Sequence, residues 1–133
     1  PWQPAYMSWA FQLPRGQALA SRWEMIPDHV DVLITHGPPH GVLDRTWDGR
    51  VVGCEALREA VTARVKPRLH VFGHIHEGYG FERLASTLFA NACTCDRTYR
   101  AVNAPLVIDV PLDRHTPAVA YEAGDTSSSR ISR

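Results

Sequence analysis

The chain has 133 residues, enough for one domain that buries about two-thirds of the surface its unfolded chain would expose. Hydrophobic residues make up 44% and charged residues 21%, which is ordinary globular usage and excludes the composition of a disordered chain. Lys plus Arg and Asp plus Glu both number 14, so no net charge directs the chain to nucleic acid or to an anionic membrane. We therefore expect a folded, soluble protein whose partners are not chosen by charge.

The three cysteines, Cys54, Cys93 and Cys95, are an odd and sparse set, unlike the disulfide framework of a small secreted domain. They favour a reducing, cytoplasmic location. No apolar run approaches the roughly 20 residues of a membrane span, and no basic-then-apolar leader opens the chain. The chain starts with Pro1 rather than Met, which indicates processing or truncation.

Residues 1–13 mix prolines with aromatic residues, a pattern that predicts an irregular packed segment whose aromatic side chains belong to the core. From Pro14 the apolar spacing becomes helical and stops at Pro27. The face expected to pack inward carries Leu19, Trp23 and Ile26.

Residues 31–35 read as a short buried strand with His36 at its carboxyl end, followed by a loop over residues 37–52. A helix is predicted from about Cys54 to Lys66, with a buried face made of Leu57, Val61 and Val65.

A second buried strand over residues 69–72 runs into the sequence Gly-His-Ile-His at 73–76. Strand, helix and strand in this order form a βαβ unit, whose two strands are expected to be parallel. Because the carboxyl ends of parallel strands meet at one edge of a sheet, His36 should lie near His74 and His76. The fold class predicted from this unit is α/β.

Residues 79–93 and 105–111 resemble the strands of a hairpin-rich ending. The final segment is rich in Ser, Gly and charge, most clearly over residues 122–133. We therefore expect a domain over residues 1–115 and a disordered tail over residues 116–133.

The candidate site consists of histidines. His74 and His76 lie two residues apart, so an extended backbone would send both imidazoles to the same side, where they could share a metal centre. A pair of surface histidines is the plain alternative, and His36 alone is more often a hydrogen-bonding residue than a ligand. Taken together, the histidine-bearing strand ends favour a site for Zn, Mn or Fe, which imidazole suits.

Other candidates have weaker support. Cys93 and Cys95 could bind a soft metal, but buried or inert thiols are the simpler interpretation. His70 lies inside an apolar strand and is expected to be a hydrogen-bonded core residue. Glu77 and Tyr79 follow the histidines and either contact a substrate or lie in a solvated loop. His29, His40 and His115 have no identifiable partner in the sequence.

Three runs, THGPPHGVLD, VGCEALREAV and RVKPRLHVFGHIHEGYG, resemble the calcineurin-like metallophosphoesterases, in particular the branch of metallophosphoesterase-domain-containing proteins. The likeness extends over roughly residues 1–111 and includes the opening PWQP and the later NACTC and VNAPLVIDVP stretches. It implies that the chain is the carboxy-terminal half of a four-layer α/β sandwich, with a βαβ unit followed by β strands.

The resemblance also implies a dinuclear site of two divalent ions, Mn, Fe or Zn, that activates water against phosphorus. His36 and His74 would then ligate the second metal and His76 the first. Neutral imidazole holds the ions without cancelling their charge, so they stay strong Lewis acids. This branch acts on phosphodiesters, with cyclic nucleotides among its substrates, and some members lack the first histidine of the Gly-His-x-His motif. Here His74 is present.

The family also requires Asp-x-His, Gly-Asp and Gly-Asn-His motifs upstream of these histidines, and none of them precedes His36 in this sequence. No catalytic residue is therefore assignable. We expect the chain alone to bind at most one metal ion and to be inactive until the missing amino-terminal half is supplied, with a small-molecule phosphoester as its substrate. The alternative is a non-catalytic module that binds a partner or a nucleotide through the same edge.

Overall fold

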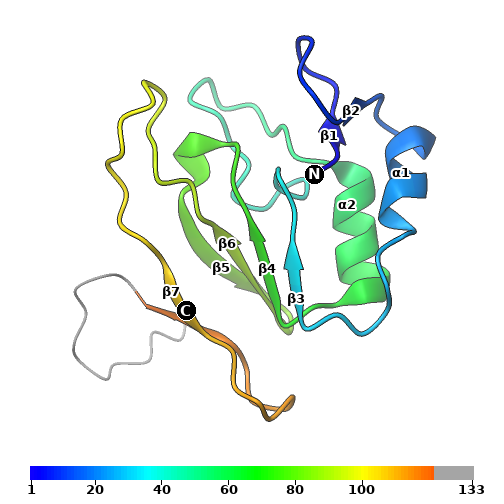
Figure 1. The fold of residues 1–133 in the computed structure, drawn as a ribbon, viewed down its shortest axis with the longest axis vertical. Coiled ribbons are helices and arrows are strands. Elements are labelled where there is room, and N and C mark those ends of the chain that lie inside the picture. Colours follow the sequence, from blue (N-terminus) through cyan, green and yellow to red (C-terminus); the bar gives the residue numbers. More distant parts are fainter. Residues whose placement is uncertain (122–133) are drawn as a thin grey trace.

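The structure is a computed structural model that describes residues 1–121. Its centre is a sheet of three parallel strands and one antiparallel edge strand (Figure 1). In spatial order these strands are β3 (Val32–Ile34), β4 (Leu69–Phe72), β6 (Thr87–Asn91) and β5 (Gly80–Leu84). The predicted α/β class and the parallel pairing of the first two strands are confirmed. The parallel pairing of β6 with β4 was not predicted from the sequence.

Two helical segments pack against one face of this sheet. Helix α1 is Gln17–Trp23, and α2 (Glu55–Glu59) continues as the π-helix η1 (Ala60–Val65). The Sγ atom of Cys54 accepts a hydrogen bond from the Leu57 N–H and caps α2. Within residues 1–121, no helix is long and apolar enough to cross a membrane.

The change of helix type keeps one face of this segment buried. Leu57, Val61 and Val65 repeat every four residues, a spacing that drifts around an α-helix of 3.6 residues per turn. In η1 the hydrogen bonds reach five residues back, which puts more residues in a turn and reverses the drift. Val65 is consequently almost as buried as Leu57, as the sequence predicted. Lys66, with φ 46°, then ends the helix in a left-handed conformation.

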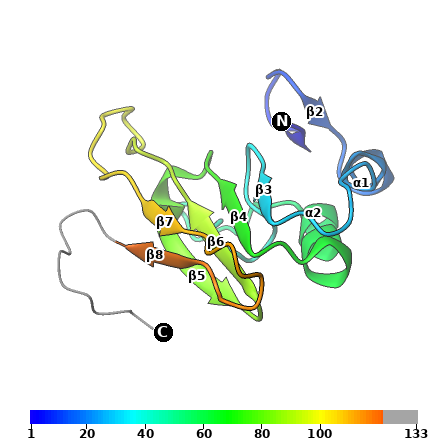
Figure 2. The same ribbon diagram turned by 60° about the horizontal axis from the view of Figure 1, so that its bottom comes forward.

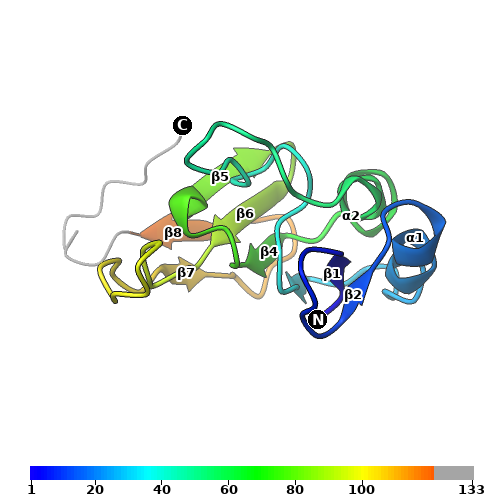
Figure 3. The same cartoon turned by 90° about the horizontal axis from the view of Figure 1, so that it is seen from above.

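The sheet has two unequal apolar faces. Figures 2 and 3 show the helices on one side and the hairpin of β7 (Val107–Asp109) and β8 (Val119–Tyr121) on the other. The helix side contains the core of Leu19, Trp23, Leu33, Val42, Cys54, Leu57, Val61, Phe72 and Phe89. The hairpin side contains a smaller core of Leu69, Leu88, Ala90, Ala118 and Ala120.

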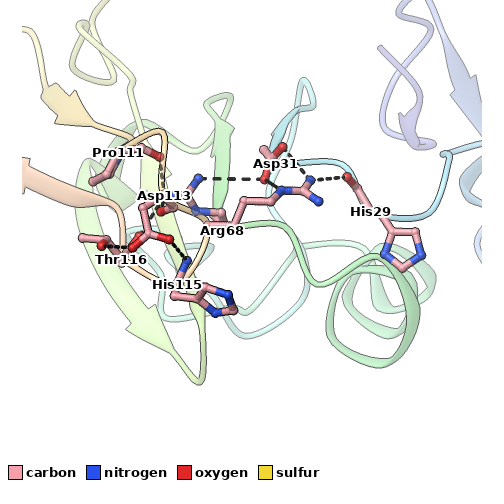
Figure 4. A network of polar contacts seen from close by, with 8 residues as sticks. His29, Asp31, Arg68, Pro111, Asp113, His115 and Thr116 are labelled. Carbon is pink, nitrogen blue, oxygen red and sulfur yellow. Dashed lines mark hydrogen bonds and ion pairs between the residues drawn. The ribbon is translucent and has the colours of Figure 1, made fainter.

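Two arginines hold the β7–β8 turn against the amino ends of the parallel strands (Figure 4). Arg68 donates from one Nη atom to three carbonyl oxygens of the turn, at 2.7, 3.1 and 2.8 Å, those of Pro111, Asp113 and Thr116. Arg114 donates to both carboxylate oxygens of Asp31, at 2.9 and 2.6 Å, and holds the pKa of that carboxyl below its usual range. The contacts fix the hairpin on its side of the sheet.

The described structure extends beyond the predicted domain boundary at residue 115. Strand β8 lies within the segment that the sequence assigned to the tail, and Ala118 and Ala120 are buried. Small alanine side chains give little apolar signal, which is why the strand was missed. The remainder of the predicted tail, residues 122–133, lies outside the described residues.

The prediction that the amino-terminal aromatic residues belong to the core is wrong for most of them. Short parallel strands β1 (Gln3–Pro4) and β2 (Gln12–Leu13) enclose a loop that projects beyond the sheet, so its side chains are exposed. These are Tyr6, Met7, Trp9 and Phe11. Trp2 alone among the aromatic residues of this segment packs against the helix-side core.

Strand β3 is also less buried than predicted. Leu33 faces the helices and is 8% exposed, whereas Val32 and Ile34 on the opposite face are 43% and 73% exposed. The reason is topological, because β3 is an edge strand and the β7–β8 hairpin packs on the strands further inside the sheet. An apolar strip and an open strand edge are left facing solvent.

His70, in the middle of β4, is a core histidine as the sequence predicted. It is fully buried, and its Nε2 lies 2.9 Å from Oγ1 of Thr35. Because the Thr35 hydroxyl donates to the Gly37 carbonyl at 2.8 Å, Nε2 of His70 carries the proton and donates. Burial lowers the pKa of His70 to about 3, so the ring is neutral.

We predict that the exposed strip on β3 makes this chain self-associate. Replacing Ile34 by Lys should shift the chain toward monomer in light scattering, since a charge on an edge strand opposes strand pairing. Leu112→Lys is the matched control, because Leu112 is fully exposed but lies in the hairpin turn. A wild-type chain that stays monomeric over a wide concentration range would contradict the prediction.

A second prediction concerns pH. Between about pH 6.5 and 3 the unfolded chain binds a proton at His70 and the folded chain does not, so the free energy of unfolding should fall as the pH falls. His70 should contribute about 1 kcal/mol of this loss between pH 6.5 and 5.5. In urea unfolding, the free energy of unfolding of His70→Gln should therefore fall by that much less over this pH range. His115→Gln, which is changed at an exposed position, should follow the wild type. Equal slopes in all three proteins would show that His70 does not titrate as argued.

Candidate metal centre

His36 and His74 meet at the carboxyl edge of the sheet. The β3–β4 pairing continues past the strands, with hydrogen bonds from the Thr35 N–H to the Val71 carbonyl at 3.0 Å and from the Gly73 N–H to the His36 carbonyl at 2.9 Å. The chains after both strands therefore stay together. Nε2 of His36 lies 3.1 Å from Nδ1 of His74, and the ring centroids are 4.7 Å apart.

His74 is held in an unusual backbone conformation. Its φ is 71°, in the left-handed region that non-glycine residues rarely occupy, and a hydrogen bond of 2.9 Å from the Ile75 N–H to the Gly73 carbonyl closes a three-residue turn around it. Such conformations cluster at functional sites. The extended backbone predicted for His74 and His76 is not observed, because this turn leads directly into the 3-10 helix η2 (His76–Gly78).

Both imidazoles of the pair are in an environment that favours the neutral form. Partial desolvation lowers the pKa of His36, and burial lowers that of His74, with smaller effects from the charges of His36 and His76. Two nitrogens bound to one ion at about 2.1 Å would lie roughly 3.0–3.4 Å apart, so the observed 3.1 Å suits a shared ion. Neutral, converging imidazoles fit a divalent metal.

His76 is oriented separately. Its Nδ1 lies 2.7 Å from the carbonyl oxygen of Asp96, which can only accept, so Nδ1 carries the proton and Nε2 is left with a free lone pair. The ring stands edge-on to Tyr99, with centroids 5.5 Å apart. In metal sites a ligating histidine usually donates its other N–H in this way.

The three predicted ligands are thus not equally placed. The structure brings His36 and His74 into contact, whereas the imidazole of His76 is hydrogen-bonded to the Asp96 carbonyl. Among residues 1–121, no group of three or more His, Cys, Asp and Glu side chains is close enough to hold a metal ion. Ligation by the three histidines stays a prediction.

Asn91, at the end of β6, fixes the backbone around these histidines. Its buried amide donates to the carbonyl groups of Ile75 at 2.8 Å and Leu43 at 3.1 Å, and its oxygen accepts from the Cys93 N–H at 3.2 Å. A Cβ at Gly78 would lie only 1.9 Å from the Leu43 oxygen, so only glycine allows this approach. Sequence reasoning missed Asn91, although a polar residue closing the apolar run TLFA was a usable signal.

The structure gives hydrogen-bond partners to Glu77 and Tyr79, the other sequence candidates beside the histidines. Glu77 accepts a hydrogen bond from the Trp47 N–H at 3.1 Å, and the Tyr79 hydroxyl donates to the Ala104 carbonyl at 2.7 Å. Cys93 and Cys95 are free thiols, and burial raises the pKa of Cys93, which favours the protonated form of its thiol.

Exposed aromatic side chains flank the histidines. Trp9 stands edge-on to His74 with centroids 5.8 Å apart and is 47% exposed, while Tyr99 beside His76 is 76% exposed. Trp9 lies in the loop between β1 and β2, and Tyr99 lies in the loop between β6 and β7; Figure 3 shows these two loops in blue and yellow. The amino-terminal segment thus contributes the contact of Trp9 with His74, in addition to the packing of Trp2 against the core.

No protein-family model matches the chain, but several known proteins are similar to it. The chain is 53% identical over 119 residues to human Metallophosphoesterase domain-containing protein 1, covering 87% of this chain and 36% of that protein. It is 47% identical over 116 residues to UPF0046 protein T07D4.2 of Caenorhabditis elegans, covering 87% and 29%. UPF0046 protein C25E10.12 of the same nematode is 42% identical over 118 residues, covering 84% and 41%.

The chain thus spans about a third of the length of these relatives. The human relative carries the name of the branch that the histidine motifs resemble, and the matching region includes most of the present chain. The chain belongs to the family of the metallophosphoesterase domain-containing proteins.

Proposed function

We propose that this chain supplies one half of the metal centre of a phosphoesterase that hydrolyses phosphodiesters, cyclic nucleotides among them. The observation that carries the proposal is the 3.1 Å separation of His36 Nε2 and His74 Nδ1, two imidazoles whose environment favours the neutral form. Their position at the carboxyl edge of parallel strands, where α/β sheets usually bind ligands, supports it. The complete domain would be a four-layer sandwich, of which the present sheet and helices are two layers.

In this proposal His36 and His74 hold one divalent ion, Mn, Fe or Zn, and His76 offers its Nε2 to the other. When bound, the ions act as Lewis acids toward phosphate oxygens and lower the pKa of water. The histidines leave that charge intact because they are neutral ligands. The Asp96 carbonyl keeps the proton of His76 on Nδ1, and the turn around His74 fixes the direction of its ring.

The exposed aromatic side chains support a substrate with a planar base. Trp9 and Tyr99 lie next to His74 and His76, and aromatic rings stack on nucleobases with little sequence preference. A small phosphoester with a base attached would therefore find both a metal-bound phosphate position and a stacking surface. The free thiols support a reducing compartment such as the cytoplasm.

We predict that the chain alone binds at most one Zn or Mn ion, measured by calorimetry with metal analysis. Two divalent ions about 3.5 Å apart repel by roughly 19 kcal/mol at an effective dielectric of about 20, and neutral imidazoles offset none of it. His36→Ala or His74→Ala should weaken binding at least about tenfold, while His115→Ala should not. The affinity should decrease as the pH decreases, because a protonated imidazole cannot bind a metal ion. The decrease should begin below pH 6.5, the ordinary pKa of histidine, since the pKa values of His36 and His74 are both lowered.

We also predict that this chain loaded with Mn turns over neither an aryl phosphodiester nor a cyclic nucleotide. A longer reading frame that includes Asp-x-His, Gly-Asp and Gly-Asn-His motifs should be active, and should lose activity when His36, His74 and His76 are changed to Ala. Histidine-dependent turnover by the short chain with two bound ions would contradict the half-site interpretation. A complete protein that binds nucleotide without turnover would favour the non-catalytic alternative.

A further inference from the structure

Residues 95–101 form a tight hairpin tip beside His76. Cys95 and Ala101 pair across it, the Asp96 N–H donates to the Arg100 carbonyl at 2.9 Å, and the Tyr99 N–H donates to the Asp96 carbonyl at 2.9 Å. The carbonyl oxygen of Asp96 therefore accepts two hydrogen bonds, one from the backbone of its own turn and one from Nδ1 of His76.

The side chain of Asp96 organises this tip. One carboxylate oxygen accepts from the Thr98 N–H at 2.8 Å, the Thr98 hydroxyl at 2.6 Å and the Arg100 N–H at 3.1 Å. The other accepts from Nε and Nη2 of Arg100 at 3.0 and 2.8 Å. These bonds, that of the Thr98 hydroxyl first, hold the pKa of Asp96 well below its usual range, so the carboxylate stays ionised at neutral pH.

The base of the hairpin is anchored to the segment that follows β6. The Val102 and Asn103 N–H groups both donate to the Thr94 carbonyl at 3.0 Å, and the Asn103 side chain donates to the Cys93 carbonyl at 2.9 Å. The position of the Asp96 carbonyl relative to His76 is therefore set at both ends of the hairpin.

We propose that Asp96 is a positioning residue for His76: its carboxylate folds the 96–100 turn so that its own carbonyl takes the Nδ1 proton and leaves the Nε2 lone pair for a metal ion. The purpose of this role, metal binding by His76, rests on the proposed function, whereas the hydrogen bonds around Asp96 do not depend on it. Without the turn, His76 is free to adopt the Nε2–H tautomer that neutral imidazole prefers in water, in which Nε2 cannot bind metal.

The test is the tautomer of His76 in the metal-free chain, read from the ¹⁵N shifts of its ring nitrogens at a pH where the ring is neutral. The wild type should show Nδ1–H. Asp96→Ala should move His76 toward Nε2–H, and Asp96→Asn, which keeps an acceptor for Thr98 and Arg100, should largely restore Nδ1–H. Asp113→Ala is the matched control, since the Asp113 carboxylate accepts from the His115 N–H and the Thr116 hydroxyl in the β7–β8 turn, at the amino ends of the parallel strands and opposite to His76.

Folding is monitored in the same spectra, because the buried His70 should keep its Nε2–H signal in every folded variant. Nε2–H at His76 in the wild type, or an unchanged tautomer in Asp96→Ala while His70 is unperturbed, would overturn the proposal. In the complete protein, Asp96→Ala should also weaken metal binding about 10- to 100-fold, with Asp96→Asn closer to the wild type. Failure of metal binding or turnover in the wild type would contradict the proposed function and leave the tautomer result standing.

Discussion

The parallel pairing of β3 with β4 is the interaction on which the candidate centre depends. Its register places Ile34 opposite Val71, and the hydrogen-bond ladder continues to the Gly73 N–H and the His36 carbonyl. Two segments separated by 38 positions in the sequence thereby arrive side by side. A shift of one residue in this register would turn Leu33 away from the helices and separate the two imidazoles, so core packing and site geometry select the same pairing.

The rest of the fold supports this pairing from one side more than from the other. The helices pack on Leu33, Phe72 and Phe89, which are all buried. His70 also donates a hydrogen bond to Thr35, the residue immediately before His36. On the opposite side the hairpin is held by Arg68 and Arg114 rather than by a large apolar core. That side is where the chain exposes apolar residues of β3.

Much of this could be predicted from the sequence, because the apolar runs and helical spacing of the βαβ unit are local signals that tertiary packing reinforces. The approach of His36 to His74 followed from that topology. What could not be predicted depends on distant contacts. The exposure of Ile34 depends on which strands the hairpin covers, and that of Trp9 on where its loop projects. The contacts of Asn91 and Asp96 with the histidine turn depend on loop conformations that no periodicity encodes.

The buried amide of Asn91 has a thermodynamic consequence. Because it donates hydrogen bonds to the Leu43 and Ile75 carbonyl groups, it orders the loop around Leu43 and the turn around His74 while the chain folds. The conformational entropy of these backbone segments is thus lost in the folding step and need not be lost again when an ion binds. A site ordered in advance gains affinity without any additional ligand, and the same histidines on a loosely held loop would bind more weakly although their chemistry is identical.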